Sequence, residues 1–265
     1  MRFIIALLLM TARAEAGPVQ TLADLPAADV VVLGETHDNP EHHRLQAQAV
    51  ANLVPKALVF EMLTPEAAAR LPVNRTDRAT VELALGWADS GWPDFAMYHP
   101  IFLAAPQAQV FGADVSQTDL VTAMKQGTAT AFGDDAALYG LDQPLDAVDQ
   151  TEREAEQAAA HCYALPVDLM PGMVAAQRLR DAALARAVVQ ALAATGGPVA
   201  VMTGNGHARR DSGFPAILTL MSSASLLSVG LLEQDPGPNA PFDLWIVTPP
   251  QPREDPCLAF GAQSG

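Results

Sequence analysis

The chain alternates between short apolar runs and longer segments whose apolar residues recur with helical spacing. Six runs rich in Val and Leu lack the alternating polar residues of a half-exposed strand, so they indicate strands buried on both faces. Buried strands separated by helices predict an α/β fold, with a mostly parallel sheet and helices on both faces. The predicted strands are Asp29–Leu33, Ala57–Met62, Gln109–Ala113, Val199–Thr203, Leu226–Leu231 and Leu244–Thr248.

Two helices have clear boundary signals. The first spans Asn39 to Val54, where Asn39 is the expected N-cap and Pro40 occupies the first helical position. The second is an Ala-rich helix from about Met173 to Ala194, and two glycines follow its end as stop signals. Both helices fit the crossover connections that a parallel sheet requires.

The middle of the chain lacks this alternation of strand and helix patterns. From about residue 118 to 170 there is no strong strand signal, and glycines and a proline interrupt the segment. Thr151–Ala160 has the composition of a polar helix. We therefore predict an inserted helical cap subdomain within a single α/β domain that spans residues 17–248.

The first sixteen residues have the pattern of a secretory signal peptide. Arg2 precedes an unbroken apolar run, and small residues follow up to Ala16. The apolar run is too short to span a bilayer, which takes about 20 residues. A buried N-terminal strand is the alternative. No cysteine follows the predicted cleavage point, so no lipid anchor is expected.

The two cysteines, Cys162 and Cys257, fit an exported protein. In an oxidising compartment they predict one disulfide, with two free thiols as the alternative. That bond would tie the cap to a Pro-rich C-terminal tail over residues 249–265, which has too many prolines to pack as a helix or central strand.

Composition narrows the class of partner. The chain has 265 residues and a net charge of -15, from 30 acidic and 15 basic side chains. Such an acidic surface argues against nucleic acid and against anionic lipid as partners. No later apolar stretch is long enough to cross a membrane. We expect a soluble protein that is periplasmic or secreted.

Ionisable residues follow four of the predicted strands. Glu35, Glu61, Asp114 and His207 each stand at or just after a strand end. Ligands of open parallel sheets bind at the carboxyl ends of the strands. Buried carboxylates are costly unless they are paired, protonated or bound to a cation, so their convergence predicts a site. Asp114 is the weakest member, because an Asp in this position is often a helix N-cap.

The predicted site suits either a metal ion or proton transfer. Glu35 and His37 are two residues apart and share one side of an extended segment. With His207 they are candidate ligands for a divalent metal, or candidate acids and bases together with Glu61. Arg178 and Asp181, three apart on the long helix, either close the site or pair with each other. Of His42 and His43 in the first helix, we expect one to face the pocket and the other to be exposed, and we assign neither a role.

Several segments together resemble the ChaN-like haem-binding family of the Tiki and erythromycin-esterase-like superfamily. The longest is Val31-Val32-Leu33-Gly34-Glu35-Thr36-His37-Asp38-Asn39-Pro40-Glu41-His42-His43. The others are Gly91-Trp92-Pro93 with Tyr98 and Pro100, His161-Cys162, Leu165-Pro166, Pro171-Gly172-Met173, Ala176-Gln177-Arg178, Arg180-Asp181 and the run from Gly204 to Asp211.

The resemblance implies an exported protein of bacterial iron and haem acquisition. It further implies that two haems pair face to face across a dimer, with a tyrosine on each iron. The haem-ligand candidates are Tyr163, Tyr139 and Tyr98, with His161 beside the first of them. The wider superfamily implies an alternative, a metal-dependent esterase or peptidase that uses Glu35, His37 and His207.

Overall fold

The computed structural model describes residues 16–255 and 257–258. The predicted signal peptide lies outside the described residues except for Ala16, as do residue 256 and the end of the C-terminal tail from residue 259. Within the described part, no helix is long and apolar enough to span a membrane.

A single sheet of seven parallel strands organises the molecule, in the order β1-β7-β6-β2-β5-β3-β4. All six predicted strands are present, with ends that differ from the predicted ones by one or two residues. The short edge strand β1 was not predicted. The strands are β1 Gly17–Pro18, β2 Val30–Glu35, β3 Ala57–Phe60, β4 Gln109–Gly112, β5 Val199–Gly204, β6 Leu226–Leu232 and β7 Leu244–Val247.

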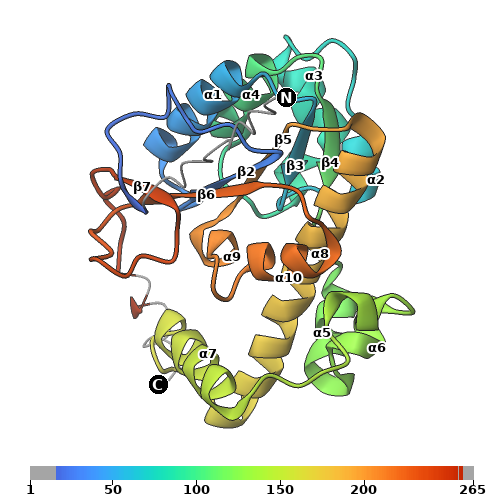
Figure 1. The fold of residues 1–265 in the computed structure, drawn as a ribbon, viewed down its shortest axis with the longest axis vertical. Helices are drawn as coiled ribbons and strands as arrows, with labels where there is room; N and C mark the ends of the chain where they lie inside the picture. The colour runs from blue at the N-terminus through green and yellow to red at the C-terminus, as the bar shows by residue number, and fades with distance from the viewer. Residues whose placement is uncertain (1–15, 256, 259–265) are drawn as a thin grey trace, which may run out of the picture.

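Helices cover both faces of the sheet, as predicted (Figure 1). Alternate residues of β2 belong to different cores: Val31 and Leu33 pack with the cluster under α1 and α4, whereas Val30 and Val32 pack with the cluster under α8 and α10. The helices are α1 Pro40–Leu53, α2 Pro65–Ala69, α3 Arg78–Leu85, α4 Phe95–Ala104, α5 Gln117–Gln126, α6 Thr128–Phe132, α7 Ala147–Ala160, α8 Met170–Thr195, α9 Asn205–Ala208 and α10 Phe214–Met221.

The boundary signals of the two predicted helices are confirmed. The Asn39 side chain accepts a hydrogen bond from the Glu41 amide and caps α1. Helix α8 ends at Gly196, whose positive φ of 71° is the left-handed conformation that glycine adopts without strain. Helix α8 begins three residues earlier than predicted, and its 26 residues span from the cap to the sheet.

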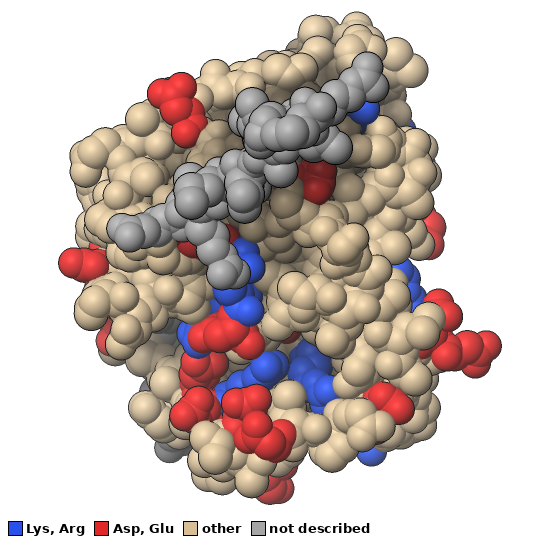
Figure 2. Space-filling model, in the orientation of Figure 1, with Lys and Arg blue, Asp and Glu red and all other residues tan. Residues whose placement is uncertain are grey.

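Residues 117–170 form the helical segment that the sequence predicts. Helices α5, α6 and α7 pack around the first half of α8, away from the sheet (Figure 1). An ion pair of 3.3 Å joins Arg209, which follows α9, to Glu156 of α7. Figure 2 shows Lys and Arg side chains among acidic ones in this lower half of the molecule.

The predicted disulfide between Cys162 and Cys257 is present, and it joins the end of α7 to the C-terminal tail. The tail is also held at the sheet. Arg253 makes ion pairs of 2.7 Å with Asp38 and 2.6 Å with Glu233. The tail therefore connects the cap to the edge of the sheet where β2 and β6 end.

Candidate functional site

The carboxyl ends of β2, β3 and β5 bring together most of the predicted site residues. These strands are adjacent, and Glu35 at the end of β2 is in register with Gly204 at the end of β5. Glu61 follows β3, and its backbone amide donates to the Met202 carbonyl of β5. We call the resulting group the polar cluster; its members are Glu35, His37, Glu61, Tyr98, Asp181 and His207.

Glu35 is buried and fully provided with hydrogen bonds. One carboxylate oxygen accepts from His37 Nδ1 and from the Tyr98 hydroxyl, both at 2.8 Å. The other accepts from Gln46 Nε2 at 2.7 Å. These hydrogen bonds offset the cost of burying the Glu35 carboxylate and fix the orientation of His37 and Tyr98.

His37 is the partly exposed member of the cluster, with one third of its side chain accessible. Burial disfavours the imidazolium, but the hydrogen bond and the charge of Glu35 outweigh it and raise the pKa of His37. The ring lies edge-on to Trp92, with 4.8 Å between centroids. A Cβ on Gly204 would lie 2.9 Å from His37 Nε2, so the glycine leaves room for this ring.

His207 lies between two buried carboxylates. Its Nδ1 donates to Asp181 at 2.7 Å, and its Nε2 lies 3.6 Å from Glu61. Burial alone would lower the pKa of His207, but these two charges raise it to about 9. The His207 ring is therefore an imidazolium at neutral pH.

Glu61 links the two histidines. Burial opposes its ionisation, yet the charges of His207 and His37 lower its pKa. One of its oxygens accepts from the Thr203 hydroxyl at 2.6 Å and from the Gly204 amide at 2.7 Å. Glu61 thus lies 3.6 Å from His207 and acts on His37 through its charge, so the two histidine–carboxylate pairs are electrostatically coupled.

The structure separates the two residues predicted on the long helix. Asp181 joins the polar cluster through His207, and burial raises its pKa. Arg178 instead donates to the carbonyls of Gly140 and Gln143 in the cap. It therefore braces the cap against α8 and does not close the site.

The prediction for His42 and His43 is wrong, because both side chains are fully buried. His42 accepts from the Thr36 amide and bonds Thr248, and burial lowers its pKa to about 4. His43 donates from Nε2 to the His37 carbonyl at 2.8 Å. Both histidines position the loop that carries His37. In the sequence, Gln46 could have indicated that this face of α1 meets polar groups, because it is a polar residue on the apolar face of the helix. Its side chain also bonds Glu35.

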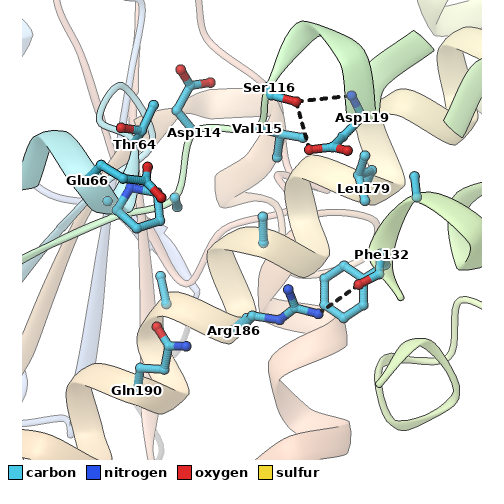
Figure 3. Close-up of a pocket in the computed structure, with 16 residues that line it drawn as sticks. Thr64, Glu66, Asp114, Val115, Ser116, Asp119, Phe132, Leu179, Arg186 and Gln190 are labelled. Atoms are coloured by element: carbon cyan, nitrogen blue, oxygen red, sulfur yellow. Dashed lines mark hydrogen bonds between the residues drawn. The ribbon is translucent and has the colours of Figure 1, made fainter. Parts of the chain in front are cut away.

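Asp114 lies apart from the polar cluster. It lines a cavity of about 410 Å³ between α2, α5, α6 and α8 (Figure 3). Glu66 of α2 and Asp119 of α5 lie on opposite sides of this cavity, and the Arg186 guanidinium stacks on the Phe132 ring at 3.5 Å. Ser116, not Asp114, caps α5.

The three tyrosines differ sharply in exposure. Tyr98 and Tyr139 are buried, at 0% and 6% exposed, and Tyr139 packs against Phe132 in the core. Tyr163 is 76% exposed just beyond the end of α7, beside the disulfide. His161 precedes it by two residues, is half-buried, and its Nδ1 donates to the Gln157 carbonyl.

Among the ionisable side chains that the structure describes, no metal centre is evident. Across residues 16–255 and 257–258, no group of three or more His, Cys, Asp or Glu side chains is arranged to hold a metal ion. The expected ligand set of Glu35, His37 and His207 does not form such a group there, because Glu35 bonds His37 while His207 bonds Asp181.

A parallel sheet with a polar cluster at its carboxyl edge and an inserted helical cap defines an α/β protein with a capped strand-end site. Within that class, the chain belongs to the ChaN family of haem-binding uptake proteins in the Tiki superfamily, whose family model matches residues 21–218.

A solved structure of a ChaN protein has a similar fold. ChaN of Campylobacter jejuni, described with cofacial haem, is 20% identical with a TM-score of 0.57, over 77% of this chain and 81% of that one. The type III effector HopBA1 is 14% identical with a TM-score of 0.46, over 91% and 100%. A mutant of erythromycin esterase EreC is 14% identical with a TM-score of 0.44, over 82% and 74%. No curated protein matches the sequence.

Proposed function

We propose that this protein binds haem and that the Tyr163 oxygen is the iron ligand. The observation that carries the proposal is the exposure of Tyr163, because Tyr98 and Tyr139 are too deeply buried to reach a haem. Burial and the charge of Glu35 also raise the pKa of Tyr98, which opposes formation of a tyrosinate there. Tyrosinate is a hard anionic oxygen ligand that suits ferric haem.

The surface near Tyr163 suits an apolar ligand. Val167 and Leu169 follow in the same connection, at 80% and 41% exposed, and Met124 of α5 is 37% exposed. Met124 lies against Gly172 at the start of α8. Exposed apolar side chains of this kind mark binding surfaces, and here they offer contacts to a porphyrin face.

Pairing of two chains around haem belongs to the same proposal. A haem bound at so exposed a tyrosine keeps one face in water, and a second copy of the chain would cover that face. The family membership and the cofacial haem of Campylobacter ChaN support this arrangement. Export through the predicted signal peptide into the periplasm fits the disulfide, which persists in oxidising compartments.

A haem titration of the chain without its signal peptide tests the proposal. We expect a saturable change in the Soret absorption and a doubling of the mass by sedimentation as haem is added. Albumin serves as a haem-binding reference and lysozyme as a protein control for nonspecific adsorption. A spectrum that matches the lysozyme mixture, or a linear response without saturation, would reject haem binding.

Hydrolysis is the second candidate function, and the polar cluster favours it. Haem at Tyr163 has no need of two histidine–carboxylate pairs at the sheet edge, whereas an ester or amide hydrolase needs a base that activates water. His37, which is the accessible member, would be that base, and Glu35 would orient its ring. If His37→Ala abolishes an esterase or peptidase activity while haem affinity holds, the two sites are separate; an activity that survives the change would exclude His37 as the base.

A further inference from the structure

Helices α5, α7 and α8 enclose a cavity of about 240 Å³ inside the cap. Helix α8 lines it with Met173, Ala176, Gln177 and Arg180, whose spacing places them on one helical face. Leu120 and Met124 of α5 form an opposing apolar wall. Gln117, Gln157 and His161 complete the lining, so the cavity combines an apolar wall with polar side chains and the charged group of Arg180.

Arg180 has no ion pair and no hydrogen bond within the described part of the chain. It is half-buried, and its Nε atom is buried without a partner. The charges of Asp114 and His207 act on Arg180 only from beyond ion-pair distance. Leaving a charge partly out of water without a partner is costly, so an unpaired arginine in a cavity wall points to an anion.

The remainder of the lining agrees. No Asp or Glu lines the cavity, although acidic residues outnumber basic ones two to one in the whole chain. Gln177 Oε1, in the same wall, is a second buried polar atom without a partner. The Arg180 and Gln177 side chains both line the cavity, so a guanidinium and an amide lie beside an apolar surface, which suits a small amphipathic ligand.

We infer that this cavity binds a small organic carboxylate with an apolar body, of the size of a medium-chain fatty acid. Arg180 binds the carboxylate, and Leu120, Met124 and Met173 cover the apolar body. A volume of about 240 Å³ falls below the usual range for drug-sized ligands and is too small for a porphyrin. Tyr163 does not line the cavity, but Met124 and His161 do, so the cavity adjoins the surface proposed for haem and the test uses the haem-free chain.

Isothermal titration of the haem-free, disulfide-intact chain with octanoate tests the inference. We expect saturable binding that Arg180→Gln weakens by roughly tenfold to a hundredfold, the usual effect of a lost charge-assisted hydrogen bond. Arg153→Gln is the matched control, because Arg153 is also a half-buried arginine but lines the neighbouring cavity beside His207. Arg153→Gln and Tyr163→Phe should leave octanoate binding unchanged.

Two further ligands and one further variant test which part of the fatty acid the cavity recognises. Octanol lacks the charge and inorganic phosphate lacks the apolar body, so neither should bind at the concentrations that saturate octanoate. Ala176→Met fills the cavity and keeps Arg180, so it should block binding even if Arg180→Gln fails to fold. The inference is overturned if octanoate gives no saturable heat, or if phosphate or octanol binds equally well. It is also overturned if Arg180→Gln or Ala176→Met binds octanoate like the unchanged chain. The third contrary result is loss of binding in Arg153→Gln or Tyr163→Phe.

Discussion

At the scale of single residues, His207 is a charged group enclosed by two buried carboxylates. Its side chain is 9% exposed and lies between Asp181 and Glu61. A buried charge that loses one partner costs several kcal/mol, about 3–5 in measured cases. His207 therefore stabilises the fold only while its ring is protonated.

The stability of the protein should fall at alkaline pH. The pKa of His207 is raised from 6.5 to about 9 by folding, so its contribution is complete below pH 6.5 and is lost as the pH rises through 9. The free energy of unfolding should decrease by about 3 kcal/mol between these values. Urea unfolding from pH 6 to 10 measures it.

Asp181→Asn provides the control for this prediction, because removal of one carboxylate lowers the pKa of His207. The decrease in stability should then begin at lower pH. A flat profile in the unchanged chain would show that His207 is not held as an imidazolium.

Residues at the ends of strong strand patterns were predictable from the sequence. Glu35, Glu61 and His207 were found because polar residues that end buried strands are conspicuous. The roles of Tyr98 and His43 were not, because each reaches the cluster from a helix whose packing angle no local pattern encodes. Arg178 and Asp181 show the same limit. Their spacing places both on one side of α8, but it does not determine that Arg178 bonds the cap while Asp181 bonds His207.

At the scale of elements, the turns that follow the strands are tightly packed. A Cβ on Gly112, at the end of β4, would lie 2.3 Å from the backbone oxygens of both Leu63 and Thr64. Backbone atoms cannot rotate away as a side chain does. Gly112 therefore allows the segment after β3 to lie against the end of β4.

Gly112→Ala should destabilise the protein by about 1–3 kcal/mol, the usual cost of overpacking. Gly206→Ala is the matched control, because a Cβ there meets nothing within 4 Å and its φ is not in the left-handed region. Thermal unfolding of both variants measures the difference. Equal melting temperatures for the two would contradict the close approach at Gly112.

Helix α4 was not predicted from the sequence. Helix α4 is apolar on nearly every side and contains Pro100, so neither its periodicity nor its composition indicated a helix. It forms because its apolar side chains pack against α1 and the sheet, with Phe102 stacked on Phe60 at 4.6 Å. The amphipathic α7, in contrast, was predicted: its last residue is the predicted one, and its first residue lies four positions before the predicted start.

At the scale of the whole molecule, the C-terminal tail joins two regions that are distant in sequence. The disulfide closes a loop of 95 residues between the cap and the tail. The Arg253 ion pairs fix the same tail to Asp38 and Glu233 beside the polar cluster. The cap therefore has one covalent link to the sheet edge besides the main chain.

Loss of the disulfide should destabilise the protein by about 2–5 kcal/mol, the usual effect for a native bond. The tail is also held by hydrogen bonds of Pro249 and Gln251 and by the Arg253 ion pairs, of which the pair with Asp38 is the more exposed and is screened by salt. Melting temperatures with and without dithiothreitol, at low and high salt, measure both effects. We expect the reduced chain to be more sensitive to salt than the oxidised one; equal melting temperatures for the oxidised and reduced chains would show that the bond does not stabilise the cap.

The central claim is that Tyr163 holds haem iron, and resonance Raman spectroscopy of the ferric haem complex tests it most directly. The spectrum of the unchanged chain should contain the bands of an iron-bound tyrosinate. Tyr163→Phe should remove them without unfolding the chain, because the side chain is 76% exposed, while Tyr139→Phe should keep them. If the tyrosinate bands are absent from the unchanged chain, or persist in Tyr163→Phe, the assignment of Tyr163 as the iron ligand is wrong.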